Sequence, residues 1–158
     1  MDHTDPHDEN VYDALATADD DGRWAFGTGF DAGTAEIDAP APEGVERDDL
    51  AAYCLMLADD ALIAAQRLAG WTAKAPELEE DVALANIALD LLGQARVLLS
   101  RAGHLGAAEP FRAGPQDDED VLTYFRDDRA FRNVTLVETD LGDFGRTIAW
   151  ILVLSSWR

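Results

Sequence analysis

The chain has 158 residues, enough for one domain, and 47% of them are hydrophobic, which is enough for a buried core. Its formal net charge of −20 argues against nucleic acids and anionic membrane surfaces as partners, because both bind basic rather than acidic proteins. A single cysteine excludes a disulfide framework within the chain, so we expect a reducing, intracellular setting and Cys54 as a small core residue.

The expected location is the cytoplasm. The N-terminus is acidic and polar, which is unlike a secretory signal. The longest strongly apolar run, Ile148–Leu154, is far shorter than the roughly 20 residues that span a bilayer. The excess of acidic residues has two possible explanations, adaptation to a salt-rich cytoplasm or the codon bias of a GC-rich genome.

Residues 1–47 are predicted to be a mostly irregular N-terminal extension and linker. Met1–Asn10 is polar and acidic, Val11–Ala18 has the pattern of a short helix, and Arg23–Phe30 is predicted to be a loop anchored by aromatic side chains. Asp31–Glu46 contains two prolines and two glycines, which predicts an extended linker. We expect a helical domain from residue 48 to residue 158.

A long helix is predicted for Leu50–Gly70, with Asp48 or Asp49 as its N-cap. Its apolar residues recur at the spacing of a helix face. Trp71 and the short connection Thr72–Ala75 follow it. This helix and the next one are therefore expected to form an antiparallel hairpin.

The longest helical pattern lies within Pro76–Gly103 and is predicted to be the central helix of a bundle. Acidic residues occupy its first turn, where the helix dipole favours negative charge, and Gly103 is predicted to be its C-terminal cap. Apolar residues cover more than half of its circumference. We therefore expect this helix to be buried on most sides.

Three polar residues form one row on the central helix, because Asn86, Asp90 and Gln94 are spaced at i, i+4 and i+8. Apolar residues lie on both sides of the row, which suggests that it points into the bundle, where another helix would supply hydrogen-bond partners. The alternative is a solvent-facing stripe on a partly buried helix.

Beyond the central helix, a short helix is predicted at Val121–Arg126, capped by the acidic residues 117–120. Asn133–Glu138 is compatible with a further helical segment. A last helix, Phe144–Arg158, is predicted with Asp143 as its N-cap. Because it is apolar on most faces and no fourth long helix is present, either a partner chain completes the bundle or the chain is a fragment.

The long helices also raise the question of a di-iron site. Such sites take a Glu from each of two helices and a Glu-x-x-His from each of two others. No Glu-x-x-His occurs in this chain; the nearest equivalent begins at Asp90 and has Gly93 where the histidine would stand. The first helix offers Asp59 and Asp60 but no Glu. With no Gly-x-Ser-x-Gly motif either, we expect no catalytic residue, no metal and no cofactor in this chain.

Four stretches carry a resemblance to a known family. Leu57–Trp71 and Ala75–Arg96 resemble the structural subunit of the phenylacetyl-CoA ring epoxidase, the PaaC family. Asp127–Glu138 and Gly142–Ala149 match the same family in the same order. The resemblance covers roughly Asp48–Ala149 and implies an all-α, ferritin-like helical bundle, here an incomplete and C-terminally truncated copy.

The resemblance also implies a function. In the family, this subunit forms a heterodimer with a catalytic subunit that carries a di-iron centre, and the complex converts phenylacetyl-CoA to its ring-1,2-epoxide with O₂ and electrons from NADPH. This chain would be the non-catalytic structural subunit, and Asn86, Asp90, Gly93 and Gln94 would be degenerate metal-site positions. Two alternatives remain open: a stand-alone di-iron oxidase, and a helical homodimer in which the polar row sets the helix register.

Overall fold

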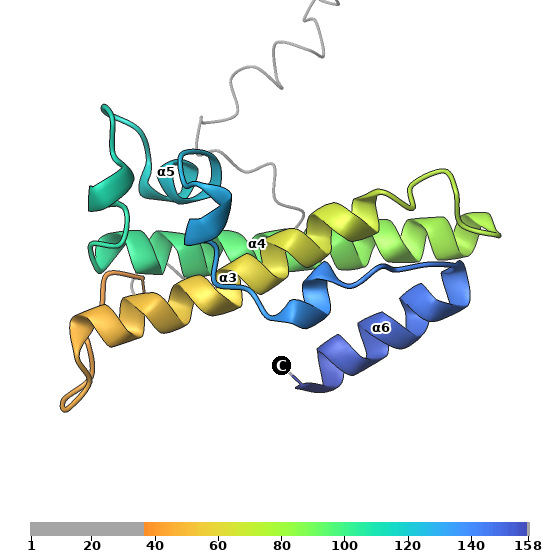
Figure 1. The fold of residues 1–158 in the computed structure, drawn as a ribbon, viewed down its shortest axis with the longest axis horizontal. Coiled ribbons are helices and arrows are strands. Elements are labelled where there is room, and N and C mark those ends of the chain that lie inside the picture. The colour runs from red at the N-terminus through yellow and green to blue at the C-terminus, as the bar shows by residue number, and fades with distance from the viewer. Residues whose placement is uncertain (1–36, 158) are drawn as a thin grey trace, which may run out of the picture. The chain divides into compact units, whose positions relative to one another are not determined.

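The computed structural model describes residues 37–157, and the predictions for Val11–Ala18 and Arg23–Phe30 lie outside them. Over this range the structure is all-α, with helices and short 3₁₀ turns but no strand (Figure 1). It is an incomplete ferritin-like helical bundle with a long helix hairpin at its centre, as the sequence predicted. Residues 38–46 are not helical, and they contain a turn in which the Val45 N–H donates to the Pro42 carbonyl at 3.1 Å.

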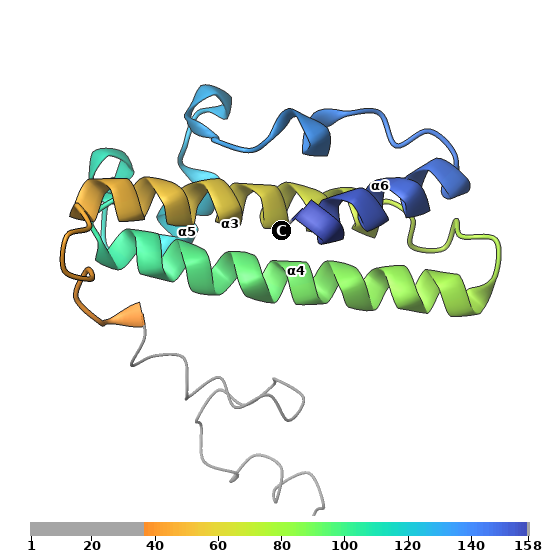
Figure 2. The same ribbon diagram turned by 90° about the horizontal axis from the view of Figure 1, so that it is seen from below.

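Helices α3 (Arg47–Ala69) and α4 (Leu78–His104) form the predicted antiparallel hairpin (Figure 2). The predicted cap of α3 was wrong, because the N-cap position belongs to Glu46, which makes no side-chain capping bond. Asp48 and Asp49 lie inside the first turn instead. There they interact favourably with the helix dipole without accepting the capping hydrogen bond.

The predicted end of α4 at Gly103 was also wrong. The helix continues to His104, and Gly106, with φ +98°, is the residue that reverses the chain. The Gly106 N–H donates to the Gly103 carbonyl at 2.7 Å, and the Ala107 N–H donates to the Ala102 carbonyl at 3.0 Å. These two bonds form a Schellman motif. In this motif the glycine stands directly after the C-cap residue, here Leu105, and not within the helix.

Two hydrophobic clusters hold the hairpin together, one towards each end. The first joins α3 and α4 to α5 (Asp118–Tyr124), and its buried members are Cys54, Leu55, Ala58, Leu99, Ala102, Ala108, Val121 and Leu122. The second joins the hairpin to α6 (Phe144–Trp157), and its buried members are Ala64, Leu68, Leu84, Ala88, Val137, Trp150 and Leu154. Cys54 is therefore a core residue, as predicted.

The chain between α4 and α6 is mostly irregular. It contains the 3₁₀ helices η2 (Glu109–Phe111), η3 (Asp128–Ala130) and η4 (Thr135–Glu138), so the helix suggested for Asn133–Glu138 is a single 3₁₀ turn. Helix α5 begins earlier than the predicted Val121 and ends at Tyr124, before Arg126. The cap of α6 is confirmed, because the Arg146 N–H donates to Asp143 Oδ1 at 2.8 Å.

Helix α4 is not buried on most sides by residues 37–157. Figure 2 shows α3 and α6 along the same side of it. Five of its large apolar side chains are exposed: Leu78, Val82, Leu89, Leu92 and Val97. The prediction fails because the described chain supplies too few neighbouring helices. By length and composition alone α4 also qualifies as a membrane-crossing helix, a test that the core helices of soluble proteins pass as well.

Candidate interaction surface

Two adjacent carboxylates in the middle of α3 are buried and fully engaged. Asp59 and Asp60 are 0% and 1% exposed. Asp59 Oδ2 accepts hydrogen bonds from Arg126 Nη1 at 3.0 Å and from the Arg132 backbone N–H at 2.8 Å. Asp60 Oδ1 accepts from the Val134 backbone N–H at 2.7 Å. The pair therefore fastens the segment after α5 to the middle of α3.

Arg126 neutralises this buried charge. Its Nη2 donates to Asp59 Oδ1, so the pair is bidentate, and its Nε donates to the Leu122 carbonyl. The guanidinium also lies over the Phe131 ring, 4.2 Å from the ring centre. A buried ion pair is tolerated when its geometry is good and the remaining polar atoms are hydrogen-bonded. This cluster meets both conditions, so its role is to connect α3 to the segment after α5 rather than to react.

The carboxylates of α3 do not fit a di-iron centre. Both oxygens of Asp59 accept from a guanidinium that occupies the side where a metal cation would have to approach. Among residues 37–157, no group of three or more His, Cys, Asp or Glu side chains has a geometry suited to a metal ion. That the chain binds no iron remains a prediction.

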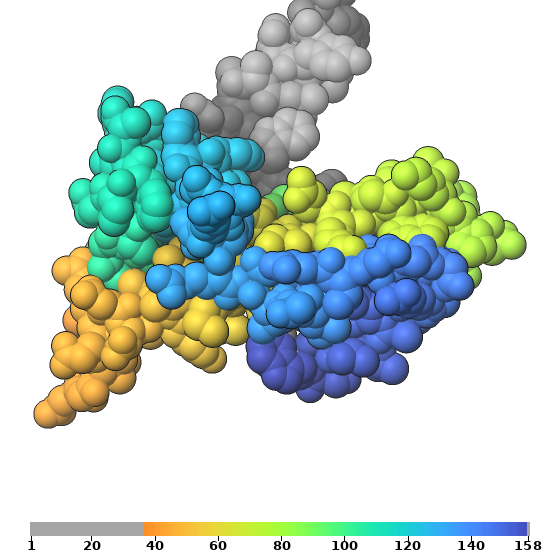
Figure 3. All heavy atoms as spheres, in the orientation of Figure 1, coloured from red at the N-terminus to blue at the C-terminus, as the bar shows by residue number. Residues whose placement is uncertain are grey.

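A second group of contacts holds α6 in position beside α3. The Trp150 Nε1–H donates to the Leu136 carbonyl at 2.8 Å, and Arg67 Nη1 donates to the Val137 carbonyl. The Arg67 guanidinium lies 6.0 Å from the centre of the Trp150 ring. These contacts connect α3, η4 and α6, and Figure 3 shows residues 133–157 as a continuous surface beside the hairpin.

An apolar groove of about 320 Å³ lies between α4 and α6. It is lined by Glu80, Ala83, Leu84, Ile87, Phe144, Ile148, Ile151, Leu152 and Ser155. Glu80 is the only charged residue of this lining, and its Oε2 is buried without a hydrogen-bond partner. The groove continues the exposed apolar surface of the two helices, since Ile148 and Leu152 are themselves exposed.

The predicted polar row lies on the outer face of α4. Asn86, Asp90 and Gln94 are exposed and Gly93 is half-buried. Residues 37–157 do not bury the row. Within this part of the chain, the row is therefore a solvent-facing stripe, which was the alternative prediction. The row shares its face with exposed Val82, Leu89 and Val97. Its origin as a degenerate metal site is still a prediction.

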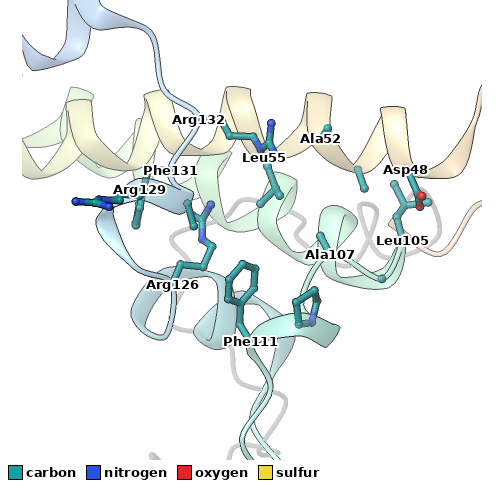
Figure 4. Close-up of a pocket in the computed structure, with 14 residues that line it drawn as sticks. Asp48, Ala52, Leu55, Leu105, Ala107, Phe111, Arg126, Arg129, Phe131 and Arg132 are labelled. Carbon is teal, nitrogen blue, oxygen red and sulfur yellow. The ribbon is translucent and has the colours of Figure 1, made fainter.

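A second hollow, of about 500 Å³, lies at the other end of α3 (Figure 4). Figure 4 shows Arg132 near Leu55 and Asp48 towards the opposite end, while Arg129 points away. Arg126, which also lines it, is already paired with Asp59. The hollow therefore brings together no set of free polar groups that suits one reaction.

The carboxylates that the described structure buries, Asp59 and Asp60, are not among the residues of the predicted polar row. The pair Asp59-Asp60 was indistinguishable from the many other acidic neighbours of this chain, and Arg126 was predicted only as the end of a short helix. The available signal was their position: the buried alanines Ala58 and Ala61 flank the two carboxylates directly. Adjacent acids inside such an apolar stretch need a buried partner.

Comparison with known proteins gives the family. Residues 35–158 match the family described as "Phenylacetic acid catabolic protein". Over 111 residues the chain is 47% identical to one of the subunits of the 1,2-phenylacetyl-CoA epoxidase of Escherichia coli (strain K12). That alignment covers 70% of this chain but 42% of the relative, so the chain spans less than half of the relative's length. The resemblance seen in the sequence is confirmed, and the chain belongs to the phenylacetic acid catabolic protein family.

Proposed function

We propose that this chain is a structural, non-catalytic subunit of a multicomponent phenylacetyl-CoA ring-1,2-epoxidase that acts in the cytoplasm. Its family and its identity to a subunit of the Escherichia coli epoxidase support this assignment. In the proposed complex, the di-iron centre belongs to a separate catalytic subunit. The task of this chain is to pack against that subunit and keep its helices in place.

One observation carries the non-catalytic part of the proposal. Both oxygens of the buried Asp59 carboxylate already accept hydrogen bonds, from the Arg126 guanidinium and from the Arg132 backbone N–H. A ferritin-like bundle that served iron chemistry would keep such carboxylates free for the metal. Here they fix the fold, which suits a scaffold.

Exposed apolar surface supports the packing role. Large side chains on α4 and α6 remain in water, although each would contribute about 1.5–3 kcal/mol if it were fully buried. The exposed members are Leu78, Val82, Leu89, Leu92, Val97, Ile148, Leu152, Val153 and Trp157. Surface of this kind is typical of a face that another protein covers.

Co-expression with the catalytic subunit encoded in the same genome tests the assignment. We expect one complex by size-exclusion chromatography with light scattering. Iron analysis of the separated subunits should find iron only in the partner. Stoichiometric iron in this chain alone would favour the stand-alone oxidase, and recovery of only self-associated chain would favour the homodimer.

A further inference from the structure

The segment that leads into α3 is held by one side chain from the end of α4. Arg101, in the last turn of α4, donates through Nη1 to the Ile37 carbonyl at 2.5 Å and to the Ala39 carbonyl. Its Nη2 donates to the Pro40 carbonyl at 3.4 Å. A guanidinium carries five N–H donors in one rigid plane, so a single arginine can bind several carbonyls together, whereas a lysine has no such fork.

The same turn of α4 holds the segment at two further points. Arg47 Nη2 donates to the His104 carbonyl at 2.7 Å, where the helix dipole favours a positive charge. His104 Nδ1 lies 3.4 Å from Asp38 Oδ1, although both side chains are exposed and such pairs contribute little. Residues 37–46, which we call the strap, are therefore tied to the end of α4 at both of their ends (Figure 2).

Little else holds the strap. Its side chains are exposed or half-buried, and none of them belongs to either hydrophobic cluster of residues 37–157. The Glu46 N-cap of α3 makes no side-chain capping bond. A segment that buries so little apolar surface opens at a much lower free energy than the whole molecule unfolds. The closed position of the strap therefore depends mainly on Arg101.

The strap is also stiff enough to move as one piece. Pro40 and Pro42 have a fixed φ and restrict the residue before each of them. A turn follows, in which Gly44 has φ +81° and the Val45 N–H donates to the Pro42 carbonyl at 3.1 Å. Because three carbonyls of the strap share one donor group, the loss of that group releases them together rather than one at a time.

We propose that the strap opens and closes on the end of α4 as one unit, with Arg101 as the side chain that holds it closed, while the hairpin, α5 and α6 stay folded. Opening exposes the backbone of residues 37–46 to a protease or to another chain, and it frees the Arg101 guanidinium. It needs no partner protein, so this opening and the proposed function can fail independently.

Three variants of the full chain test the role of Arg101. Arg101→Met removes the guanidinium and keeps an aliphatic side chain, and Arg101→Lys keeps the charge without the planar fork. Arg96→Met is the matched control, because Arg96 lies on the same helix and pairs with Glu119 rather than with the strap. Circular dichroism confirms that each variant retains its helices.

Cleavage by a glutamyl endopeptidase measures the open population. Glu43 and Glu46 lie in the strap, and Glu138 in η4 is an exposed reference site outside it. When opening is fast relative to cleavage, the rate at each site follows the fraction of molecules that are open there. We expect Arg101→Met to accelerate cleavage after Glu43 and Glu46 by the same factor, at least about tenfold, and Arg101→Lys by a smaller factor. Cleavage after Glu138 should not change, and Arg96→Met should behave like the wild type.

An unchanged rate at Glu43 in Arg101→Met would overturn the proposal, since another contact would then hold the strap. Acceleration at Glu43 alone would overturn it as well, because the segment would then fray residue by residue. Equal acceleration at Glu138, or the same acceleration in Arg96→Met, would show that the whole chain loosens, which contradicts a strap that opens separately.

Discussion

Asp59 in the middle of α3 and Arg126, 67 positions later, form a bidentate ion pair that is closed off from water. The same carboxylate accepts the Arg132 backbone N–H at 2.8 Å. One side chain thus holds two points of a segment that has almost no regular structure of its own. The path of the chain from α5 towards α6 depends on it.

Asp59→Asn is expected to lower the free energy of unfolding by about 3 kcal/mol, because it leaves the Arg126 charge buried without a counter-ion. Urea unfolding followed by circular dichroism measures the loss. Asp49→Asn, on the exposed start of the same helix, should change stability by less than about 0.5 kcal/mol. Equal effects of the two substitutions would contradict a structural role for the ion pair.

Replacing both partners should be milder than replacing one. The double variant with Asp59→Leu and Arg126→Met removes the two charges together and leaves neither unpaired, so it should recover part of the loss caused by Asp59→Asn. If the double variant were less stable than the wild type by the sum of the losses measured for Asp59→Leu and Arg126→Met alone, the two residues would not be coupled.

Gly103→Ala is expected to destabilise the chain by about 1–3 kcal/mol, because it overfills the contact between α4 and α5. A Cβ at this position would lie 2.8 Å from Asp118 Cγ and closer still to Asp118 Cβ. Gly145→Ala is the control, since its Cβ would meet nothing nearer than Asp143 Oδ1 at 3.6 Å. Thermal unfolding should show a lower midpoint for Gly103→Ala and an unchanged or higher one for Gly145→Ala.

Structural features that depend on neighbouring residues could be predicted from the sequence, and features that join distant residues could not. The hairpin and the Asp143 cap follow from periodicity and capping, which act within a few residues, and both were predicted. The ion pair between Asp59 and Arg126 joins residues far apart in the chain. The apolar neighbours of Asp59 indicate that it is buried, but no local pattern indicates which of the basic residues pairs with it. That information exists only once the helices pack.

The segment Asn133–Glu138 shows the same limit. Its apolar pattern is compatible with a helix, but the Val134 N–H is bonded to Asp60, and the Leu136 and Val137 carbonyls accept from side chains of α6 and α3. Together with the i→i+3 bonds from the Val137 N–H to the Val134 carbonyl and from the Thr139 N–H to the Leu136 carbonyl, these contacts hold the segment as a 3₁₀ turn. The polar row of α4 is exposed for a related reason: no helix among residues 37–157 covers Asp90, and the burial of the row stays a prediction.

Ala73→Gly is expected to stabilise the chain by about 0.5–1 kcal/mol. Ala73 has φ +63° in the turn between α3 and α4, a conformation that costs an L-residue about 1–2 kcal/mol and glycine almost nothing. Glycine retains the N–H that donates to Asp81 Oδ1 at 2.7 Å. Ala75→Gly in the same turn should bring no gain, so equal stabilisation by both substitutions would rule out the backbone explanation.

Cys54 should react slowly with thiol reagents while the chain is folded. Burial raises the pKa of its thiol above the ordinary value of 9.0, although the positive charge of Arg101 acts in the opposite direction. Because the folded-state pKa is the higher one, this contribution to stability is complete below pH 9 and is lost as the pH rises through the folded-state value. Wild-type stability should therefore fall more steeply above pH 9 than that of Cys54→Ala. Rapid labelling at pH 7 in native buffer would contradict the burial of the thiol.

Asp90→Leu tests whether the outer face of α4 takes part in chemistry. The residue is exposed, so its replacement should change the stability of the isolated chain by less than about 0.5 kcal/mol. In the assembled enzyme it should leave turnover per iron-loaded catalytic subunit unchanged, because the proposed role of this chain is structural, and any effect should be on assembly. Turnover is measured with saturating phenylacetyl-CoA, after the amounts of complex and iron have been matched to the wild type. A fully assembled, fully loaded complex that had lost its activity would show that this chain contributes to the reaction itself.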